Sequence, residues 1–235
     1  MIAARVITVC DPAEPGVVHS KFSVRRRYVE GKLIPSLQAS GLDASVFQAI
    51  TPKRSVIKDG RIHAGGLSVA LNNHGCPNNF LSNMLLWREC VTTGGTLLIC
   101  EDDALLPDGA VGVVTAALDD FDRDEDRGDI LFLLAQNPSV RDLIRCHPED
   151  AITPAAGSLV RLGYANDLSC TAAYALRPVA AAALLERSEE KGHDATDCFV
   201  HTAFREGRIG VVVPKDYQNT FMLHEVWEPY CHTEV

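Results

Sequence analysis

The sequence predicts an α/β protein with a central, mainly parallel sheet flanked by helices. Short apolar segments alternate with longer segments of helical spacing along the 235-residue chain, which is the pattern of strands joined by crossover helices. Glycine or proline stands at most of the predicted boundaries. We find no internal repeat and no linker, so we expect a single domain over residues 1–235.

The chain begins with a predicted strand, helix and strand. Residues 5–10 (RVITVC) are short, apolar and β-branched, and Asp-Pro follows them, so they predict a buried strand. Residues 23–40 predict a helix that Pro35 either kinks or ends early and that Gly41 terminates. Residues 45–50 predict the next strand.

A long helix and an apolar strand occupy the middle of the chain. Residues 51–75 are polar and glycine-rich without a sustained period, and we expect irregular structure there. Pro77 stands at the first turn of the next predicted helix, and Gly94 with Gly95 ends it. Residues 96–100 (TLLIC) then predict a strand buried on both faces.

The second half continues the alternation of helices and strands. Its predicted elements are a helix at 111–118, a strand at 130–135, a strand at 169–176, an alanine-rich helix from Pro178 to Gly192, a short helix from Thr196 to Glu206, and a strand at 209–213. We expect residues 136–168 and the tail after the last strand to be irregular.

Composition and charge narrow the possible partners. The formal net charge is -9 and the longest basic run is Arg25-Arg26-Arg27, which excludes the broad basic surface that nucleic-acid binding requires. The eight cysteines are scattered without a C-x-x-C pair, so we expect reduced thiols and no structural zinc. The apolar start of the chain is too short for a signal peptide or a transmembrane segment, and we expect a cytoplasmic protein.

Three consecutive carboxylates, Glu101, Asp102 and Asp103, follow the apolar strand at 96–100 directly. Carboxylates at the end of a strand can bind Mg²⁺ or Mn²⁺, which typically take one or two carboxylates together with phosphate oxygens and water. Alternatively, the acids form a polar turn in which Asp102 or Asp103 caps the following helix. The residues alone leave both interpretations open.

Four parts of the chain together resemble one known family. They are Arg25 to Tyr28 with 37–50, Gly75-Cys76 with Leu81-Ser82 and Trp87, LLICEDDALL at 97–106, and CTAAYALRPVAAAALL at 170–185 with 194–214. In this order they resemble glycosyltransferase family 25, the lipooligosaccharide and collagen galactosyltransferase-like group. The chain departs from the pattern at Asn83, where the family usually has histidine, and in a longer gap between Cys76 and Ser82.

The resemblance implies a nucleotide-sugar-binding fold of the GT-A type, a UDP-sugar donor, a saccharide or other hydroxyl acceptor, and Mn²⁺ or Mg²⁺. Asp103 with Asp102 and Glu101 would hold the metal against the diphosphate. Arg25 or Arg26 would pair with a phosphate, and the alternative for either one is a position on a solvated helix face.

Two further site residues are implied by the same resemblance. Asp197 would deprotonate the acceptor hydroxyl for a displacement with inversion, with Asp194 as the nearest substitute. Its alternative role is to cap the predicted helix beside Thr196. His224 would be a metal ligand near the C-terminus, and its alternative is a surface or packed histidine.

Two other functions remain open on the sequence. A metal-dependent phosphate-ester hydrolase would use the same acidic cluster, but it would need further ligands for a second metal. A non-catalytic homologue that binds nucleotide sugars or carbohydrate is favoured if Asn83 marks a loss of turnover.

Overall fold

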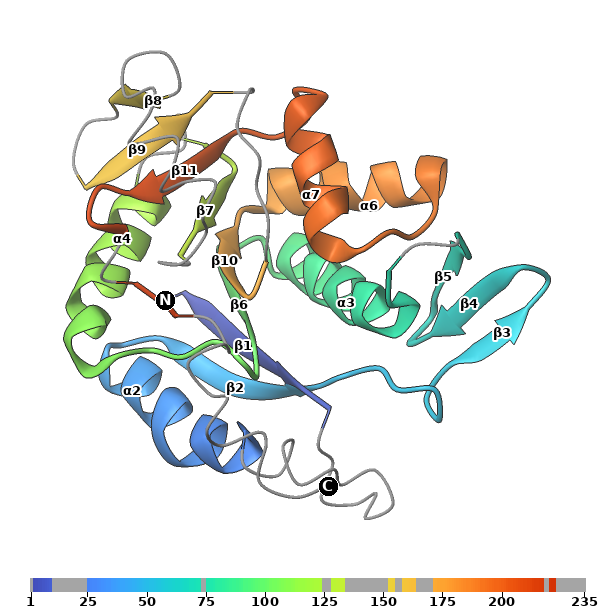
Figure 1. Ribbon diagram of the computed structural model, residues 1–235, viewed down its shortest axis with the longest axis horizontal. Coiled ribbons are helices and arrows are strands. Elements are labelled where there is room, and N and C mark those ends of the chain that lie inside the picture. Colours follow the sequence, from blue (N-terminus) through green and yellow to red (C-terminus); the bar gives the residue numbers. More distant parts are fainter. Residues whose placement is uncertain are drawn as a thin grey trace.

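The computed structural model describes residues 2–9, 25–72, 75–123, 128–133, 152–154, 158–163, 171–217 and 220–222. Within these residues the chain forms an eight-stranded sheet with helices on both faces and a separate three-stranded antiparallel sheet (Figure 1). The predicted α/β class is therefore confirmed.

The large sheet is mixed, with one dominant strand direction. In spatial order its strands are β2 (Asp43–Gln48), β1 (Ala3–Thr8), β6 (Leu97–Glu101), β10 (Ala173–Leu176), β7 (Ile130–Phe132), β11 (Val211–Pro214), β9 (Leu159–Leu162) and β8 (Ile152–Pro154). Of the described strands, β10 and β9 run antiparallel to their neighbours and the other six share one direction. The carboxyl ends of β2, β1 and β6 thus meet at one edge.

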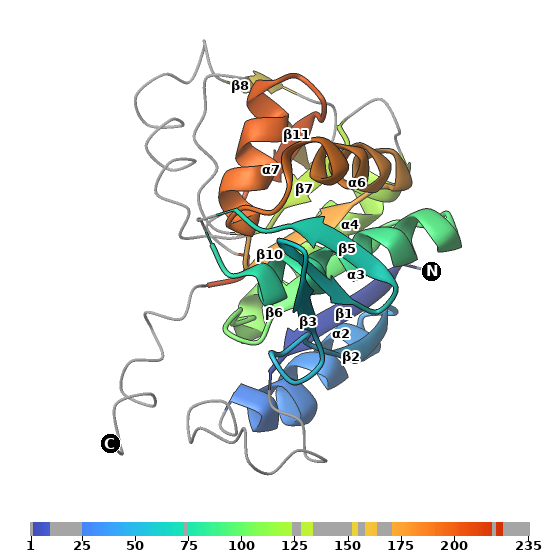
Figure 2. The same cartoon turned by 90° about the vertical axis from the view of Figure 1, so that its right-hand side faces the viewer.

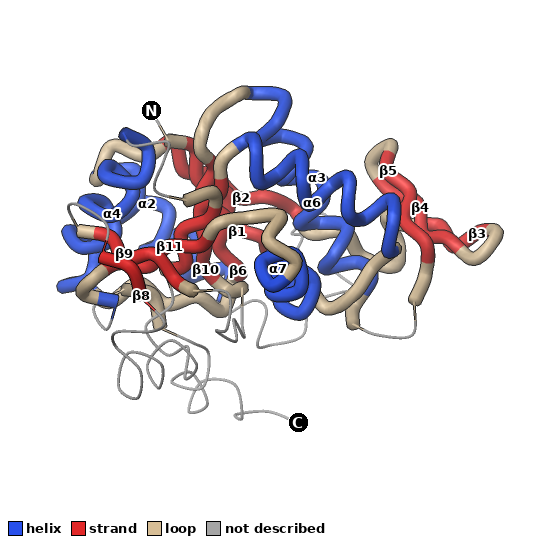
Figure 3. Tube along the Cα trace, turned by 90° about the horizontal axis from the view of Figure 1, so that it is seen from above, coloured by secondary structure: helices blue, strands red, loops and turns tan. Residues whose placement is uncertain are grey.

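Two groups of helices cover the two faces of this sheet, as the view in Figure 3 shows. One face is covered by α3 (Pro77–Thr93), α6 (Pro178–Lys191) and α7 (Thr196–Arg205), and the other by η2 (Val29–Leu33), α2 (Ile34–Ala39) and α4 (Val111–Arg123). Phe80, Trp87 and Phe199 fill the core on the first face, and Leu33 and Phe121 fill it on the second. None of the helices in the described part of the chain has the length and apolar composition needed to cross a bilayer.

Pro35 is accommodated within a helix that changes its winding. The helix is described from residue 25, passes through the π-helical segment η2, and continues as α2, in whose first turn Pro35 lies. Ile34, the residue before it, donates its N–H to the carbonyl oxygen of Val29 in the π-helical pattern, so Pro35, which has no N–H, lies where the hydrogen-bonding pattern of the helix changes. Gly41, at a φ of 85°, follows the helix end as predicted.

Residues 51–75 are not irregular, and that prediction was wrong. They contain the antiparallel strands β3 (Val56–Lys58), β4 (Arg61–Ala64) and β5 (Leu67–Ala70), which face the viewer in Figure 2. Tight turns at Asp59-Gly60 and Gly65-Gly66 connect them, and all four residues have positive φ. Such dipeptides are hairpin turns, but the strands between them are too short to show a period. For the same reason β8 and β9 were missed in residues 136–168.

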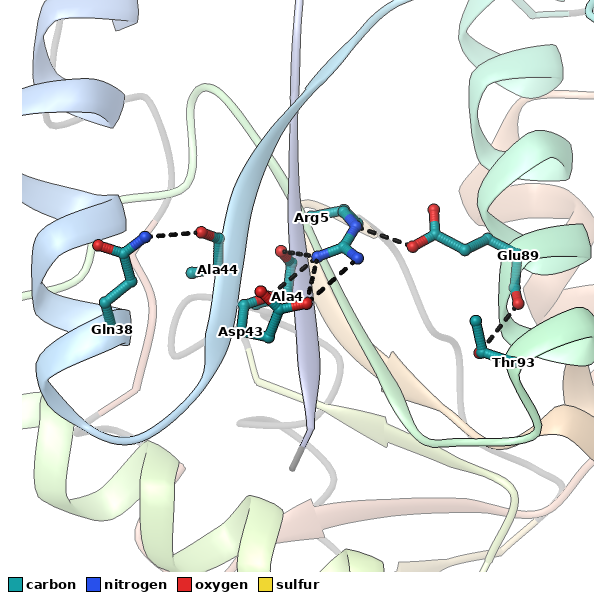
Figure 4. A network of polar contacts seen from close by, with 7 residues as sticks. All are labelled: Ala4, Arg5, Gln38, Asp43, Ala44, Glu89 and Thr93. Atoms are coloured by element: carbon teal, nitrogen blue, oxygen red, sulfur yellow. Dashed lines mark hydrogen bonds and ion pairs between the residues drawn. The ribbon is translucent and has the colours of Figure 1, made fainter.

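Arg5 joins β1 to its neighbours on both sides (Figure 4). Its Nε donates to Oε1 of Glu89 in α3 at 2.8 Å, and one terminal nitrogen donates to the carbonyl oxygen of Asp43 in β2 at 2.9 Å. Gln38 of α2 donates to the carbonyl oxygen of Ala44 in β2 at 2.9 Å. These contacts hold the amino-terminal half of β1, so the opposite end of the strand is presented in a fixed position.

The cysteines in the described part of the chain agree with the expectation of reduced thiols. Cys76, Cys90, Cys100 and Cys198 are free, the middle two buried and the outer two exposed. Burial raises the pKa of Cys90 to about 12, so this thiol stays protonated and packs as a small apolar side chain.

Candidate active site

The carboxylates of Glu101, Asp102 and Asp103 stand where β6 leaves the sheet. The apolar residues of β6 are fully enclosed, Glu101 is its last residue, and Asp102 and Asp103 form the turn that follows. The helical segment beginning at Asp108 has Pro107 as its N-cap without any side-chain hydrogen bond. Neither aspartate therefore caps a helix, and the capping alternative is excluded.

A cavity of about 370 Å³, here called the first cavity, opens beside these acids. It lies at the carboxyl ends of three parallel strands, the position at which open α/β sheets bind ligands. One part of its wall is apolar and the other is charged. The lining residues are Ile7, Val9, Arg25, Ala49, Ile50, Thr51, Pro52, Cys76, Asn78, Asn79, Glu101, Asp102 and Asp103.

A second cavity, of about 230 Å³, adjoins the first. It is lined by Cys76, Asn79, Glu101, Thr171, Ala195, Thr196 and Asp197. The two cavities share Cys76, Asn79 and Glu101, which we call the junction. Two hollows that meet at one carboxylate can hold two molecules side by side.

The second cavity exists because the amino-terminal ends of α3 and α7 touch. Gly75 has a φ of 78°, and a Cβ at this position would overlap the backbone of Asp194 and Ala195. Only glycine allows this approach without displacing one of the two segments. Residues about 120 positions apart in the sequence are thus brought together at one wall.

Arg25 and Arg26 have different positions. Arg25 is buried, lines the first cavity, and places one terminal nitrogen 3.1 Å from Oδ1 of Asp102 and 3.8 Å from Oδ2 of Asp103. Arg26 donates its Nε to Oε1 of Glu30, one helical turn away, at 2.6 Å, and lines neither cavity. Of the two predicted phosphate-binding arginines, Arg25 is therefore the one at the site.

The acids at this edge are held in an environment that disfavours their charge. Burial, and after it the charge of Asp103, raises the pKa of Glu101 to about 7. Burial also raises the pKa of Asp102, and the charge of the Arg25 guanidinium partly offsets this rise. Oδ1 of Asp103 is buried and accepts no hydrogen bond from the described residues. A cation near Asp103 would satisfy this oxygen.

A chain of hydrogen bonds runs from the core to Glu101. Nε1 of Trp87 donates to the Tyr174 hydroxyl at 2.9 Å, and this hydroxyl donates to Oδ1 of Asn83 at 2.8 Å. Nδ2 of Asn83 donates to Oδ1 of Asn79 at 3.2 Å, and Nδ2 of Asn79 donates to Oε1 of Glu101 at 3.2 Å. No local feature of the sequence indicates that these four residues and Glu101 form one network.

Asp197 lies in the first turn of α7 and lines the second cavity with Glu101. The N-cap of α7 is Ala195, so Asp197 does not have the capping role proposed as its alternative; its Oδ1 accepts the N–H of Cys198 at 2.8 Å. Oγ1 of Thr196, in the same wall, is buried and has no hydrogen-bond partner among the described residues. Asp194 accepts the N–H of Ala195 at 2.8 Å and is not part of this wall.

The donor set at the end of β6 fits a hard divalent cation. Asp103 offers a buried carboxylate oxygen that has no hydrogen-bond partner among the described residues, and Asp102 lies beside it. In the described part of the chain no group of three or more His, Cys, Asp or Glu side chains forms a complete metal site. Two carboxylates are nevertheless sufficient for Mg²⁺ or Mn²⁺ when phosphate oxygens and water supply the other ligands. His224 lies outside the described residues.

Comparison with protein-family models gives no match for this chain, and comparison with curated proteins gives none either. The function of the site is therefore argued from its geometry and chemistry.

Proposed function

We propose that the protein is a metal-dependent glycosyltransferase of the GT-A type, related to glycosyltransferase family 25, which moves a hexose from a UDP-sugar to a hydroxyl acceptor such as a saccharide. The observation that carries the proposal is the placement of Glu101, Asp102 and Asp103 beside two adjoining cavities, the second of which contains Asp197. A reaction between two bound molecules requires such a pair of sites.

The first cavity would hold the nucleotide part of the donor. Its apolar wall, which includes Ile7, Ile50 and Pro52, provides a surface for the base. The diphosphate would lie toward Arg25, whose guanidinium can bind phosphate oxygens through two parallel hydrogen bonds. Asp102 and Asp103 would hold Mn²⁺ or Mg²⁺, which would supply a Lewis acid to offset the charge of the leaving diphosphate.

The second cavity would hold the acceptor. Asp197 takes the proton from the acceptor hydroxyl, the acceptor oxygen forms a bond to the anomeric carbon, and the bond from that carbon to the diphosphate oxygen breaks with inversion. The transferred sugar then occupies the junction, where Glu101 borders both cavities. We place this reaction in the cytoplasm, in keeping with the free thiols of the described cysteines.

The two alternative functions have less support. A two-metal phosphate-ester hydrolase needs ligands beyond the acidic turn, and the described residues contain no further group of that kind. A non-catalytic binding protein would not need a carboxylate such as Asp197 next to the junction.

Calorimetric titration of UDP-glucose, UDP-galactose and UDP-N-acetylglucosamine, with and without Mn²⁺, tests the proposal. We expect metal-dependent binding of at least one UDP-sugar by the wild-type protein and its loss in Asp103→Ala. Asp108→Ala is a matched control, because it removes an exposed carboxylate that lines neither cavity. If the wild-type protein binds no UDP-sugar in the presence of Mn²⁺, the glycosyltransferase proposal is wrong.

A further inference from the structure

The hydrogen-bond chain that ends at Glu101 has a single possible direction. An indole N–H only donates, so Trp87 must be the first donor, and the amide NH₂ group of Asn79 also only donates, so Glu101 is the last acceptor. Between these ends the Tyr174 hydroxyl must donate to Asn83, and each asparagine must accept on oxygen and donate from nitrogen. Every donor in the chain therefore points toward the junction.

Burial makes this arrangement rigid. Trp87, Tyr174 and Asn83 are at most 1% exposed, so water does not compete for their polar atoms. A buried polar group without a partner destabilises a protein by about 1–3 kcal/mol, which disfavours any rotation of the Asn83 amide. Asn83 also donates to the backbone oxygen of Asn79 at 3.1 Å, and both residues belong to α3.

The chain controls how Glu101 meets a ligand. One carboxylate oxygen, Oε1, accepts from Asn79, which fixes the plane of the carboxylate at the junction. A hydroxyl group of a molecule lying across the two cavities finds a carboxylate acceptor held in place there. Hydrogen bonds between hydroxyls and carboxylates are short and about twice as strong as those between neutral groups.

Given the glycosyl transfer proposed above, we propose that Asn79 and Asn83 are positioning residues that hold the Glu101 carboxylate as the acceptor for a hydroxyl of the transferred sugar. Glu101 then determines which sugar fits, and the four residues behind it maintain its orientation.

The positioning role also accounts for the asparagine at position 83, where the family that this chain resembles usually has histidine. A neutral imidazole also carries one acceptor nitrogen and one donor N–H on a short side chain. It can accept from Tyr174 and donate to Asn79, so the direction of the chain is preserved. The departure at Asn83 is thus a replacement of equivalent hydrogen-bonding character.

Binding of UDP and of the tightest-binding UDP-sugar to Asn83→Leu and Asn83→His tests this role. Leucine has a similar volume but neither accepts nor donates, and we expect it to weaken UDP-sugar binding about ten- to hundredfold. Binding of UDP, which has no sugar at the junction, should be unchanged. Asn83→His should restore most of the lost affinity. Asn79→Ala, which removes the last donor and also the oxygen that accepts from Asn83, should reproduce the weakened UDP-sugar binding of the leucine variant if Asn83→Leu does not fold.

The outcomes separate this inference from the function on which it depends. If the wild-type protein binds neither UDP nor any UDP-sugar, the proposed function fails. If the wild-type protein binds both and the leucine variant keeps its UDP-sugar affinity, the positioning role is wrong. It is also wrong if UDP and UDP-sugar binding weaken equally, because a general loss of structure would have that effect, or if the histidine variant binds no better than the leucine variant.

Discussion

Two buried arginines of this protein pair with carboxylates, and the two clusters differ in kind. On α6, Arg187 donates two hydrogen bonds to both oxygens of Glu206, at 2.9 and 3.1 Å, and its guanidinium lies 4.4 Å from the centre of the Phe199 ring. At the end of β6, one terminal nitrogen of Arg25 approaches two aspartates at unequal distances, and each aspartate has one buried oxygen without a hydrogen-bond partner among the described residues. The first cluster is paired completely and the second incompletely.

The carboxyl groups of the two clusters show opposite shifts. The hydrogen bond from Arg187 lowers the pKa of Glu206, whereas burial raises the pKa of both Asp102 and Glu101. Complete pairing stabilises a charge within the protein. Acids that are incompletely paired beside a cavity would be stabilised in their charged form by a bound cation. Burial of the acids together with their incomplete pairing, rather than the presence of charged residues, separates the candidate site from the Arg187–Glu206 cluster.

The largest effect should follow from a change at the candidate site, and it should appear in the rate of transfer rather than in the stability of the protein. Asp197→Asn removes the proposed base, so transfer should slow by about 10² to 10⁴-fold, while donor binding, located in the first cavity, remains. Steady-state transfer assays with calorimetry of UDP-sugar binding measure both. Asp194→Asn is the control, since that residue lies outside the second cavity. If it alone abolishes transfer, the base has been misassigned.

At the cluster of Arg187 and Glu206 we expect an effect on stability alone. Glu206→Ala leaves the buried Arg187 guanidinium without its paired carboxylate, and we expect the free energy of unfolding to fall by about 2–3 kcal/mol. Urea denaturation measures this change, with Glu189→Ala on the exposed side of α6 as the control. UDP-sugar affinity should not change. A loss of affinity at unchanged stability would contradict the distinction between the clusters.

Glu101→Gln should stabilise the metal-free protein at high pH. The pKa of Glu101 is raised from 4.5 to about 7 in the folded state, so the folded protein binds an extra proton in this range and stability falls as pH rises through it. Glutamine does not titrate and can still accept from Asn79. We expect equal stability near pH 4 and a gain of about 3 kcal/mol for the variant at pH 8, measured by urea unfolding in EDTA. A constant difference at all pH values would show that Glu101 does not titrate in this range.

The smallest effect is expected at Arg26. Its pair with Glu30 is a partly exposed contact between successive helical turns, and such pairs contribute about 0.3–0.5 kcal/mol. Arg26→Gln should therefore change thermal stability little and leave UDP binding intact, whereas Arg25→Gln should weaken UDP binding. Equal losses in the two variants would show that both arginines contact the phosphates.

The sequence predicts this fold best where a long stretch of regular apolar spacing ends at a glycine or proline. Pro77 and Gly94 bound α3 as expected, and the apolar run before Glu101 is β6. The small sheet of β3, β4 and β5 escaped prediction because its strands have three or four residues. At that length hairpin dipeptides are better evidence than periodicity.

The candidate site was predictable only in part. Glu101 and Asp103 stand out because they follow an apolar strand, but nothing local distinguishes Arg25 from Arg26, which point in directions about 100° apart on a helix. The contacts that orient Glu101 come from α3 and β10, and Asn83 meets Tyr174 across 91 positions of sequence. Pairings of that kind depend on how strands and helices pack, which no window of sequence contains.

The close approach of Gly75 to Ala195 also limits how the protein can be engineered. Gly75 has no side chain and Ala195, which lines the second cavity, has only a methyl group, so truncating a side chain at this contact would add little space. Acceptor range would have to be altered at Thr171 and Thr196, whose hydroxyls belong to the same wall. A library built on these two positions would vary the cavity while keeping the two helix ends in contact.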